Sequence, residues 1–297
     1  MDADDLFPGF TTADLRVDDA VHIRVRTGGQ GEPLLLLHGH PQTHAIWHKV
    51  APALAARFTV VLADLRGYGD SSKPAGAPDH ANYAKRVMAR DMLRAMQALG
   101  HARFDVLAHD RGARVAHRLA ADHPAAVRRL VLLDIAPTLA MYEQTTQAFA
   151  RAYWHWFFLI QPAPLPERLL EADAAAYIRD VMGRRGAGLA PFDPRALAAY
   201  ERALALPGAA HATCEDYRAS AGIDLEHDRV SRAAGEKIAC DLLVIWGERG
   251  VVQRLFDPLA LWRAQCSGRV SGHAVAAGHF IPEELPRVLA DELQAFL

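Results

Sequence analysis

The sequence predicts an α/β fold in which a mostly parallel sheet is covered by helices on both faces and carries an inserted helical cap. Two observations predict it: short, continuous apolar runs alternate with amphipathic segments, and one long helical stretch interrupts that alternation. Strands that are buried on both faces read as uninterrupted apolar runs, which is typical of parallel sheets flanked by helices. A chain of 297 residues with a hydrophobic fraction of 51% can form a large core of this kind.

Five apolar runs are the predicted core strands: Leu34–Leu37, Thr59–Ala63, Phe104–Ala108, Leu130–Leu133 and Leu242–Trp246. Between the second and third runs, apolar side chains recur at helical spacing, at Met88, Met92, Met96 and Leu99. Gly100 is expected to end that helix. The last stretch, from Glu283 to Leu297, is expected to form one closing helix.

The alternation stops between Pro137 and Arg232, where the sequence is aromatic and helical in tendency. An aromatic run at 153–158 lies in this segment. We therefore expect a core domain made of residues 1–136 and 233–297 and a helical cap made of residues 137–232.

The charge balance excludes several classes of function. The formal net charge is −2, which gives no electrostatic footprint for nucleic acid or a membrane surface. Three widely spaced cysteines, Cys214, Cys240 and Cys266, fit neither a disulfide framework nor a metal site. The sequence shows no signal peptide and no stretch with the length of a membrane span. We therefore expect a cytoplasmic protein without metal or cofactor that binds neither nucleic acid nor membranes.

The most informative motif is Val106-Leu107-Ala108-His109-Asp110-Arg111-Gly112-Ala113-Arg114, which leads from a predicted strand into a predicted helix. A tight strand–turn–helix of this kind lifts one side chain above the carboxyl edge of a sheet, and it usually carries a serine nucleophile. Here Asp110 occupies that position. A carboxylate is already ionised at neutral pH and suits displacement at a saturated carbon, with formation of an ester.

Hydrolysis of such an ester needs a base and an acid that orients the base. His279 is the expected base because it lies in a loop before the closing helix, where chain order in this type of fold places it. Asp134 ends the strand at 130–133 and is the preferred orienting acid. Glu248, in the loop after the strand at 242–246, is the alternative.

Backbone amides and arginines complete the expected site. The turn at His38-Gly39-His40-Pro41 follows a strand, so the amides of His40 and Arg111 could together bind an oxyanion formed during ester hydrolysis. Arg111 and Arg114 are three residues apart on one side of a helix. Planar guanidinium groups match a carboxylate through parallel hydrogen bonds, so we expect them to bind a substrate carboxylate. Pairing with an internal acid such as Asp134 is the alternative interpretation.

With these motifs the chain resembles the α/β-hydrolases that use an aspartate nucleophile, and among them the fluoroacetate dehalogenases. The resemblance covers nearly the whole length. It rests on core motifs at 38–42, 63–71 and 109–114 and on cap motifs at 152–158, 161–164 and 214–218. The arginine after the nucleophile, together with a Trp-His-Trp sequence in the cap, is the most specific part.

The resemblance implies a role for each matching residue. Asp110 matches the family nucleophile, Asp134 the acid and His279 the base. Arg111 and Arg114 match the pair that holds the substrate carboxylate.

The resemblance also implies a halide site in the cap, where His155, Trp156 and Tyr217 match three hydrogen-bond donors around the departing halide. The implied reaction converts a small haloacid, haloacetate, with water to glycolate and halide through an aspartyl ester. No cofactor is implied, and a homodimer is expected from the resemblance alone.

Rival functions remain open from the sequence. An epoxide hydrolase also uses an aspartate elbow and would need cap tyrosines such as Tyr217 with Tyr153 or Tyr142, but a neutral epoxide would leave Arg111 unpaired. A haloalkane dehalogenase usually has tryptophan where this chain has Arg111. A non-catalytic receptor for a small carboxylate would have no use for the Asp–His–Asp set.

Three departures from the family pattern bear on the preferred halide. Ala113 stands where a second glycine is usual, and His40 replaces a commoner phenylalanine. Arg184 and Arg185 occupy a cap segment that tends to be aromatic in the family. We expect these differences to leave the reaction class intact.

Overall fold

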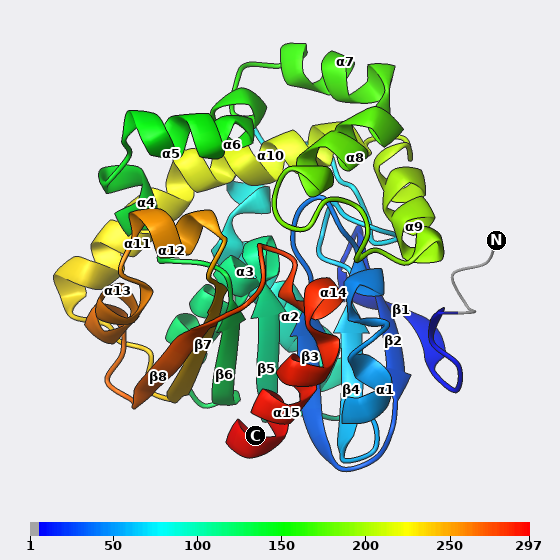
Figure 1. Cartoon of the computed structure of the whole chain (residues 1–297), viewed down its shortest axis with the longest axis vertical. Helices are drawn as coiled ribbons and strands as arrows, with labels where there is room; N and C mark the ends of the chain where they lie inside the picture. The colour runs from blue at the N-terminus through cyan, green and yellow to red at the C-terminus, as the bar shows by residue number, and fades with distance from the viewer. Residues whose placement is uncertain (1–5) are drawn as a thin grey trace.

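The computed structural model describes residues 6–297 and contains an eight-stranded sheet in the order β1-β2-β4-β3-β5-β6-β7-β8 (Figure 1). β1 and β2 pair antiparallel, β2 pairs antiparallel with β4, and all other neighbours are parallel. The strands are β1 (Thr11–Asp18), β2 (Val21–Gly28), β3 (Glu32–Leu37), β4 (Phe58–Ala63), β5 (Phe104–His109), β6 (Val127–Leu133), β7 (Asp241–Gly247) and β8 (Val270–Val275). The mostly parallel sheet predicted from the sequence is confirmed.

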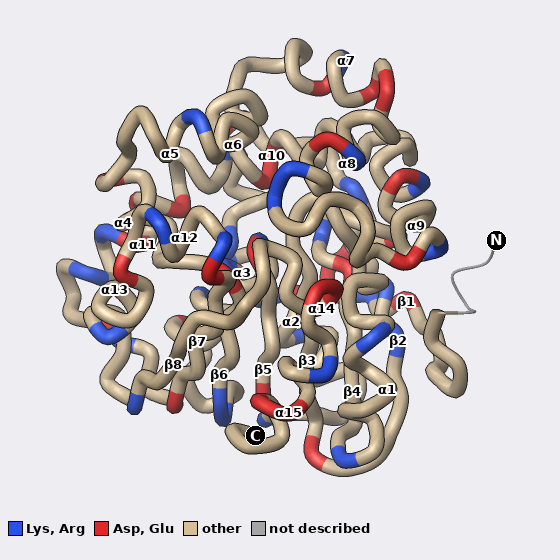
Figure 2. The backbone as a smooth tube through the Cα atoms, in the orientation of Figure 1, with Lys and Arg blue, Asp and Glu red and all other residues tan. Residues whose placement is uncertain are grey.

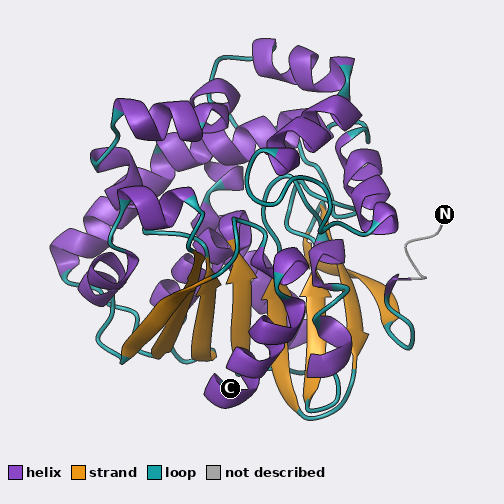
Figure 3. Cartoon of the chain, viewed as in Figure 1, coloured by secondary structure: helices purple, strands orange, loops and turns teal. Residues whose placement is uncertain are grey.

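Burial on both faces explains the uninterrupted apolar runs of the central strands. In β3, Leu35 and Leu37 belong to one hydrophobic cluster, while Leu34 and Leu36 belong to the cluster on the opposite face. The first face is covered by α2 (Lys85–Ala98), α3 (Asp110–Asp122) and α13 (Pro258–Gln265), and the second by α1 (Ala51–Leu54) and α15 (Pro286–Phe296). Figure 3 shows this arrangement of helices around the sheet.

Eight helices lie between β6 and β7 and stand above the carboxyl edge of the sheet (Figure 1). They are α4 (Thr138–Glu143), α5 (Gln147–Ala152), α6 (Trp154–Leu159), α7 (Leu165–Ala172), α8 (Ala174–Gly183), α9 (Pro194–Leu204), α10 (Ala209–Ala221) and α11 (Ile223–Ala234). These helices run from residue 138 to residue 234, whereas the sequence predicts a cap from residue 137 to residue 232. None of the helices within residues 6–297 is long and apolar enough to cross a membrane.

The structure differs from the sequence prediction at the carboxyl end. The expected single helix is two helices, α14 (Ile281–Glu284) and α15, and the break falls at Leu285. Pro286 explains the break, because proline lacks a donor for the preceding turn and disfavours helical torsions in the residue before it. Leu285 accordingly has φ −134° and ψ 52°.

The turn between β5 and α3 requires an unusual backbone conformation. Asp110 has φ +47°, in the left-handed region that non-glycine residues rarely adopt. The amide of Gly112 donates to the carbonyl of His38 at 2.8 Å, which ties the turn to the end of β3. A Cβ on Gly112 would lie 2.3 Å from that carbonyl oxygen, so only glycine allows the two loops to approach this closely.

Replacement of Gly112 by alanine should therefore destabilise the protein. The added methyl group would press on backbone, which cannot yield as a side chain does, so we expect a loss of roughly 1–3 kcal/mol in the free energy of unfolding. Chemical denaturation followed by circular dichroism would measure this loss.

Gly183→Ala is the matched control, because Gly183 is also helical and its Cβ would meet only Leu189, at 3.6 Å. This variant should be neutral or more stable by up to about 1 kcal/mol. Equal stability of the Gly112 and Gly183 variants would show that the contact with His38 does not constrain the turn.

Candidate active site

The carboxylate of Asp110 is buried at the carboxyl end of β5 and has two neighbours. Its Oδ1 accepts a hydrogen bond from the amide of His40 at 2.9 Å. Its Oδ2 lies 3.6 Å from Nε2 of His279, which comes from the loop between β8 and α14. The sequence-predicted nucleophile and base are thus brought together, with one of the two expected oxyanion amides already in contact with the nucleophile.

Asp134, and not Glu248, is the acid that the structure places at His279. Nδ1 of His279 lies 2.5 Å from Oδ2 of Asp134, whose other oxygen accepts from the amide of Gly247 at 3.0 Å. Asp134 directly follows β6 and has a left-handed conformation, with φ +50°. This conformation turns its carboxylate toward the loop that carries His279. Glu248 is exposed.

The charges of the site stabilise an ionised Asp110 beside a protonated His279. Burial alone would raise the pKa of Asp110, but its interactions with His279 and with Arg185 hold that pKa well below the ordinary value. Burial and Arg185 act to lower the pKa of His279, and the two aspartates outweigh them and raise it. Each member of the pair thus favours the charged form of the other.

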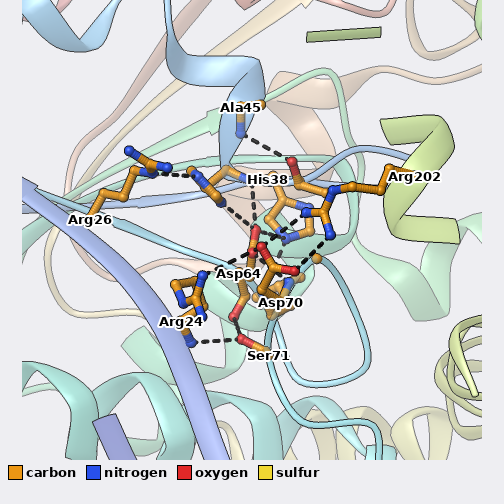
Figure 4. A network of polar contacts seen from close by, with 12 residues as sticks. Arg24, Arg26, His38, Ala45, Asp64, Asp70, Ser71 and Arg202 are labelled. Atoms are coloured by element: carbon orange, nitrogen blue, oxygen red, sulfur yellow. Dashed lines mark hydrogen bonds and ion pairs between the residues drawn. The ribbon is translucent and has the colours of Figure 1, made fainter. Parts of the chain in front are cut away.

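A second buried network fixes the loop that carries the His40 amide (Figure 4). Asp64, which directly follows β4, accepts from both the amide and the ring of His44 at 2.8 Å. His38 accepts from the amide of Leu65 at 3.1 Å and lies 3.8 Å from the carboxylate of Asp64. A Cβ on Gly39 would lie 2.3 Å from Cβ of Asp110, so this loop lies directly against the nucleophile.

Arg111 is fully buried and pairs with an internal acid, but that acid is not Asp134. Its Nε donates to the carboxylate of Asp216 at 2.7 Å, and its Nη2 donates to Ser220 at 2.6 Å. Its Nη1 is buried and has no hydrogen-bond partner among residues 6–297. Arg111 thus has one free donor nitrogen rather than a free planar fork.

Arg114 is held by neutral groups. Its Nη1 donates to the hydroxyl of Thr138 at 2.8 Å and to the carbonyl of Ala136 at 3.2 Å. Its Nε is buried and unpartnered within the described part of the chain. Burial lowers the pKa of Arg114. Arg111 and Arg114 together offer two unsatisfied cationic donors on the helix that begins at Asp110.

Two of the three predicted halide donors are buried with free polar atoms. Nε1 of Trp156 and the hydroxyl of Tyr217 have no hydrogen-bond partner among the residues that the structure describes. Each ring packs on one of the arginines: the guanidinium of Arg111 is 4.1 Å from the centre of the Tyr217 ring, and that of Arg114 is 4.7 Å from the Trp156 ring. α6 and α10 thus carry both donors over the helix that follows the nucleophile.

The third predicted donor, His155, has a different environment. Its Nε2 lies 3.0 Å from Nη2 of Arg185. A guanidinium can only donate, so the Nε2 of His155 accepts in this contact. Its ring also stacks on that of His40, at 6.2 Å between centres and 8° between planes.

Three residues that sequence reasoning did not assign to the site contribute to it. Asp216 neutralises Arg111, and His109 contacts the carbonyl of His279 through its Nε2 at 2.9 Å. Burial lowers the pKa of His109 to about 3, so its ring is neutral and donates this bond. Arg185 contacts His155 and accepts the amide of His279 on its carbonyl at 2.9 Å.

The part of the chain from residue 6 onward holds no group of three or more His, Cys, Asp or Glu side chains that could bind a metal ion.

Comparison with known proteins fits this geometry. Residues 32–286 match the family model of the α/β hydrolase fold. The chain is 44% identical, over 98% of its length and 95% of the relative, to a fluoroacetate dehalogenase from a Burkholderia species. It is 32% identical, over 91% of both chains, to a soluble epoxide hydrolase from Corynebacterium sp. (strain C12). A solved structure from Nostoc sp. PCC 7120, provisionally assigned to the α/β-hydrolases, has a TM-score of 0.94 and 52% identity over 97% of both chains.

These matches include both the catalytic edge of the sheet and the helices above it. The chain is therefore a hydrolase of the α/β-hydrolase family, in the group that contains the fluoroacetate dehalogenases.

Proposed function

We propose that this hydrolase is a haloacetate dehalogenase that converts fluoroacetate or chloroacetate and water to glycolate and halide. The observation that carries the proposal is the pair of buried, unpartnered cationic donors, Nη1 of Arg111 and Nε of Arg114, on the helix that begins at Asp110. A buried cation without a full set of partners is costly unless an anion completes its environment. A small carboxylate would do so and would hold its α-carbon next to the nucleophile.

In the first step the carboxylate of Asp110 attacks the α-carbon from the side opposite the halogen. The new C–O bond forms as the carbon–halogen bond breaks, and the halide leaves with the bonding electrons. The buried, unpartnered donors of Trp156 and Tyr217 support the proposal that they bind that halide. Each hydrogen bond to the departing anion would stabilise it by about 1.5–3 kcal/mol.

In the second step water attacks the carbonyl carbon of the ester on Asp110 and gives one proton to Nε2 of His279. The tetrahedral intermediate then collapses as the bond between that carbon and the glycolate oxygen breaks, the imidazolium protonates the departing glycolate oxygen, and the restored Asp110 carboxyl group loses its proton to solvent. Ester formation removes the negative charge of Asp110, so the pKa of His279 falls and the ring releases its proton to solvent. The neutral imidazole can then accept a proton from the attacking water. Asp134 stabilises the imidazolium that forms. The amides of His40, which contacts Asp110 in the resting protein, and of Arg111 are the two donors that we propose for the oxyanion.

Epoxide hydrolysis is the second candidate, because a relative at 32% identity is an epoxide hydrolase and Tyr217 carries a free hydroxyl. Ring opening needs such a hydroxyl to protonate the departing oxygen. A neutral epoxide would, however, leave the free donors of Arg111 and Arg114 without an anion. The charge of the pocket therefore favours the haloacid.

Parallel assays of fluoroacetate, chloroacetate and an aliphatic epoxide test this choice. Wild-type protein should release halide and glycolate and leave the epoxide intact. Arg114→Leu should lower kcat/KM for chloroacetate by roughly 100-fold or more, because the substrate carboxylate loses a charge-assisted partner in a buried site. Halide release would be followed with an ion-selective electrode.

Arg118→Leu is the control, since it is the same change one turn further along α3, where the guanidinium contacts Asp122 and Ser231. It should keep kcat/KM within about twofold, as expected for a site away from the chemistry. Epoxide turnover without halide release from either haloacetate would overturn the proposal.

The mechanism also predicts how the pKa of His279 responds to the charge of Asp110. Asp110→Asn removes a carboxylate that stabilises the imidazolium, as ester formation would, so the pKa of His279 should fall. The imidazole would then become neutral at a lower pH than in the wild-type protein. An NMR titration of the ring protons, assigned with a His279→Gln variant, measures the change.

Asp105→Asn provides the comparison, because Asp105 is equally buried but lies near the opposite end of β5. It should leave the pKa of His279 unchanged. An unchanged or higher pKa in Asp110→Asn would contradict the proposed switch from acid to base.

A further inference from the structure

Arg185 is a third cation at the site, and it comes from the loop after α8. Its carbonyl accepts the amide of His279 at 2.9 Å, which fixes its backbone beside the base. Its guanidinium lies 5.1 Å from the centre of the Tyr153 ring. Basic segments of this loop and of α12 (Val251–Leu255) stand above the carboxyl ends of the middle strands (Figure 2).

The cavity at this point has a volume of about 290 Å³ and includes His279, Asp134 and Arg185 in its lining. Three other arginines line it: Arg184 lies 3.5 Å from Asp180, Arg249 lies 3.2 Å from Glu284, and Arg254 is exposed.

Arg185, by contrast, donates Nη2 to the neutral ring of His155. Its Nη1 is buried without a hydrogen-bond partner in the described residues. It therefore has a buried donor available for an anion.

The movement of charge in the proposed reaction indicates which anion the free Nη1 of Arg185 would bind. Attack by Asp110 transfers one negative charge from its carboxylate to the departing halogen, while the substrate carboxylate keeps its charge throughout. Arg111 and Arg114 already face that carboxylate in the proposed pose. Arg185 attracts the charge on Asp110 as well as the charge on the halide, so it favours the transfer through a direct hydrogen bond from Nη1 to the halide, which the carboxylate does not receive.

We infer that Arg185 binds the departing halide through Nη1, in the place that the family pattern gives to His155. The inference rests on the proposed function and changes one role within it. Nε2 of His155 accepts a hydrogen bond from Nη2 of Arg185 and therefore cannot donate to the halide. His155 instead positions the guanidinium of Arg185. The halide would then be held by Arg185, Trp156 and Tyr217.

Halide binding to an Asp110→Asn background tests this directly. That background cannot form the ester and lacks the carboxylate that would repel a halide, and Trp156 supplies a fluorescence signal at the site. Chloride and fluoride would be titrated at constant ionic strength. Adding Arg185→Met should raise the Kd for both halides by about 10- to 150-fold, the loss expected for one charge-assisted hydrogen bond.

Arg184→Met in the same background is the matched control, because it removes the same charge from the adjacent residue, whose side chain is 74% exposed. It should change the Kd by less than about twofold, as expected for a screened surface charge. Arg185→Lys keeps the charge without the planar fork and should give an intermediate Kd, which also guards against a Met variant that fails to fold.

Turnover by the single variants separates this inference from the proposed function. Arg185→Met should lower kcat for fluoroacetate more than for chloroacetate, because fluoride is the poorer leaving group. Three results would overturn the role of Arg185: a halide Kd that Arg185→Met leaves unchanged, no halide binding to the Asp110→Asn background, or an effect of the single Arg185→Met variant on KM without an effect on kcat. Failure of the wild-type protein to release halide from any haloacetate would instead overturn the proposed function.

Discussion

The close contact between two loops at the carboxyl edge of the sheet is the constraint on which the site depends. Gly39, after β3, lies so near Asp110, after β5, that a Cβ there would collide with the nucleophile. Strands β3 and β5 are parallel neighbours, so their carboxyl ends meet at this point. The left-handed turn at Asp110 then directs its carboxylate to the amide of His40 on one side and to His279 on the other.

The same edge explains how so many charges can be buried together. Arg111 is neutralised by Asp216, which also contacts Lys85, and Lys85 lies 3.4 Å from Asp224. This chain of alternating charges connects α3, α10, α2 and α11 and offsets the cost of desolvating each ion. Removing one member would leave an uncompensated charge in the interior, so the network requires the helices above the sheet to keep their positions over the nucleophile.

The sequence predicts those parts of the protein that depend on local pattern. Apolar runs gave the five central strands, and the small residues around Asp110 gave the turn. β8 was not predicted because it lies at the edge of the sheet, where Val270, Ser271 and Gly272 are only partly buried and show no apolar run. The break at Leu285 follows from Pro286, a local signal that a single closing helix did not take into account.

Long-range pairings were harder to predict. The partner of Arg111 is Asp216, 105 residues further along the chain, and nothing in the helical spacing of Arg111 and Arg114 indicates it. The contact between Arg185 and His155 likewise joins two separate segments of the helical insertion between β6 and β7. The sequence shows the departure at Arg184 and Arg185 but not its consequence for His155. Such contacts depend on how the helices pack, which a residue pattern along one segment does not encode.

The proposed function depends most on the covalent ester between Asp110 and the substrate. A single-turnover reaction with chloroacetate in water enriched in heavy oxygen tests it most directly, followed by mass analysis of the peptide that contains Asp110. Because water attacks the ester carbonyl, the account predicts that the label enters the Asp110 carboxylate in the first turnover. Label found only in glycolate after one turnover would mean that water attacks the substrate carbon directly and would contradict the account.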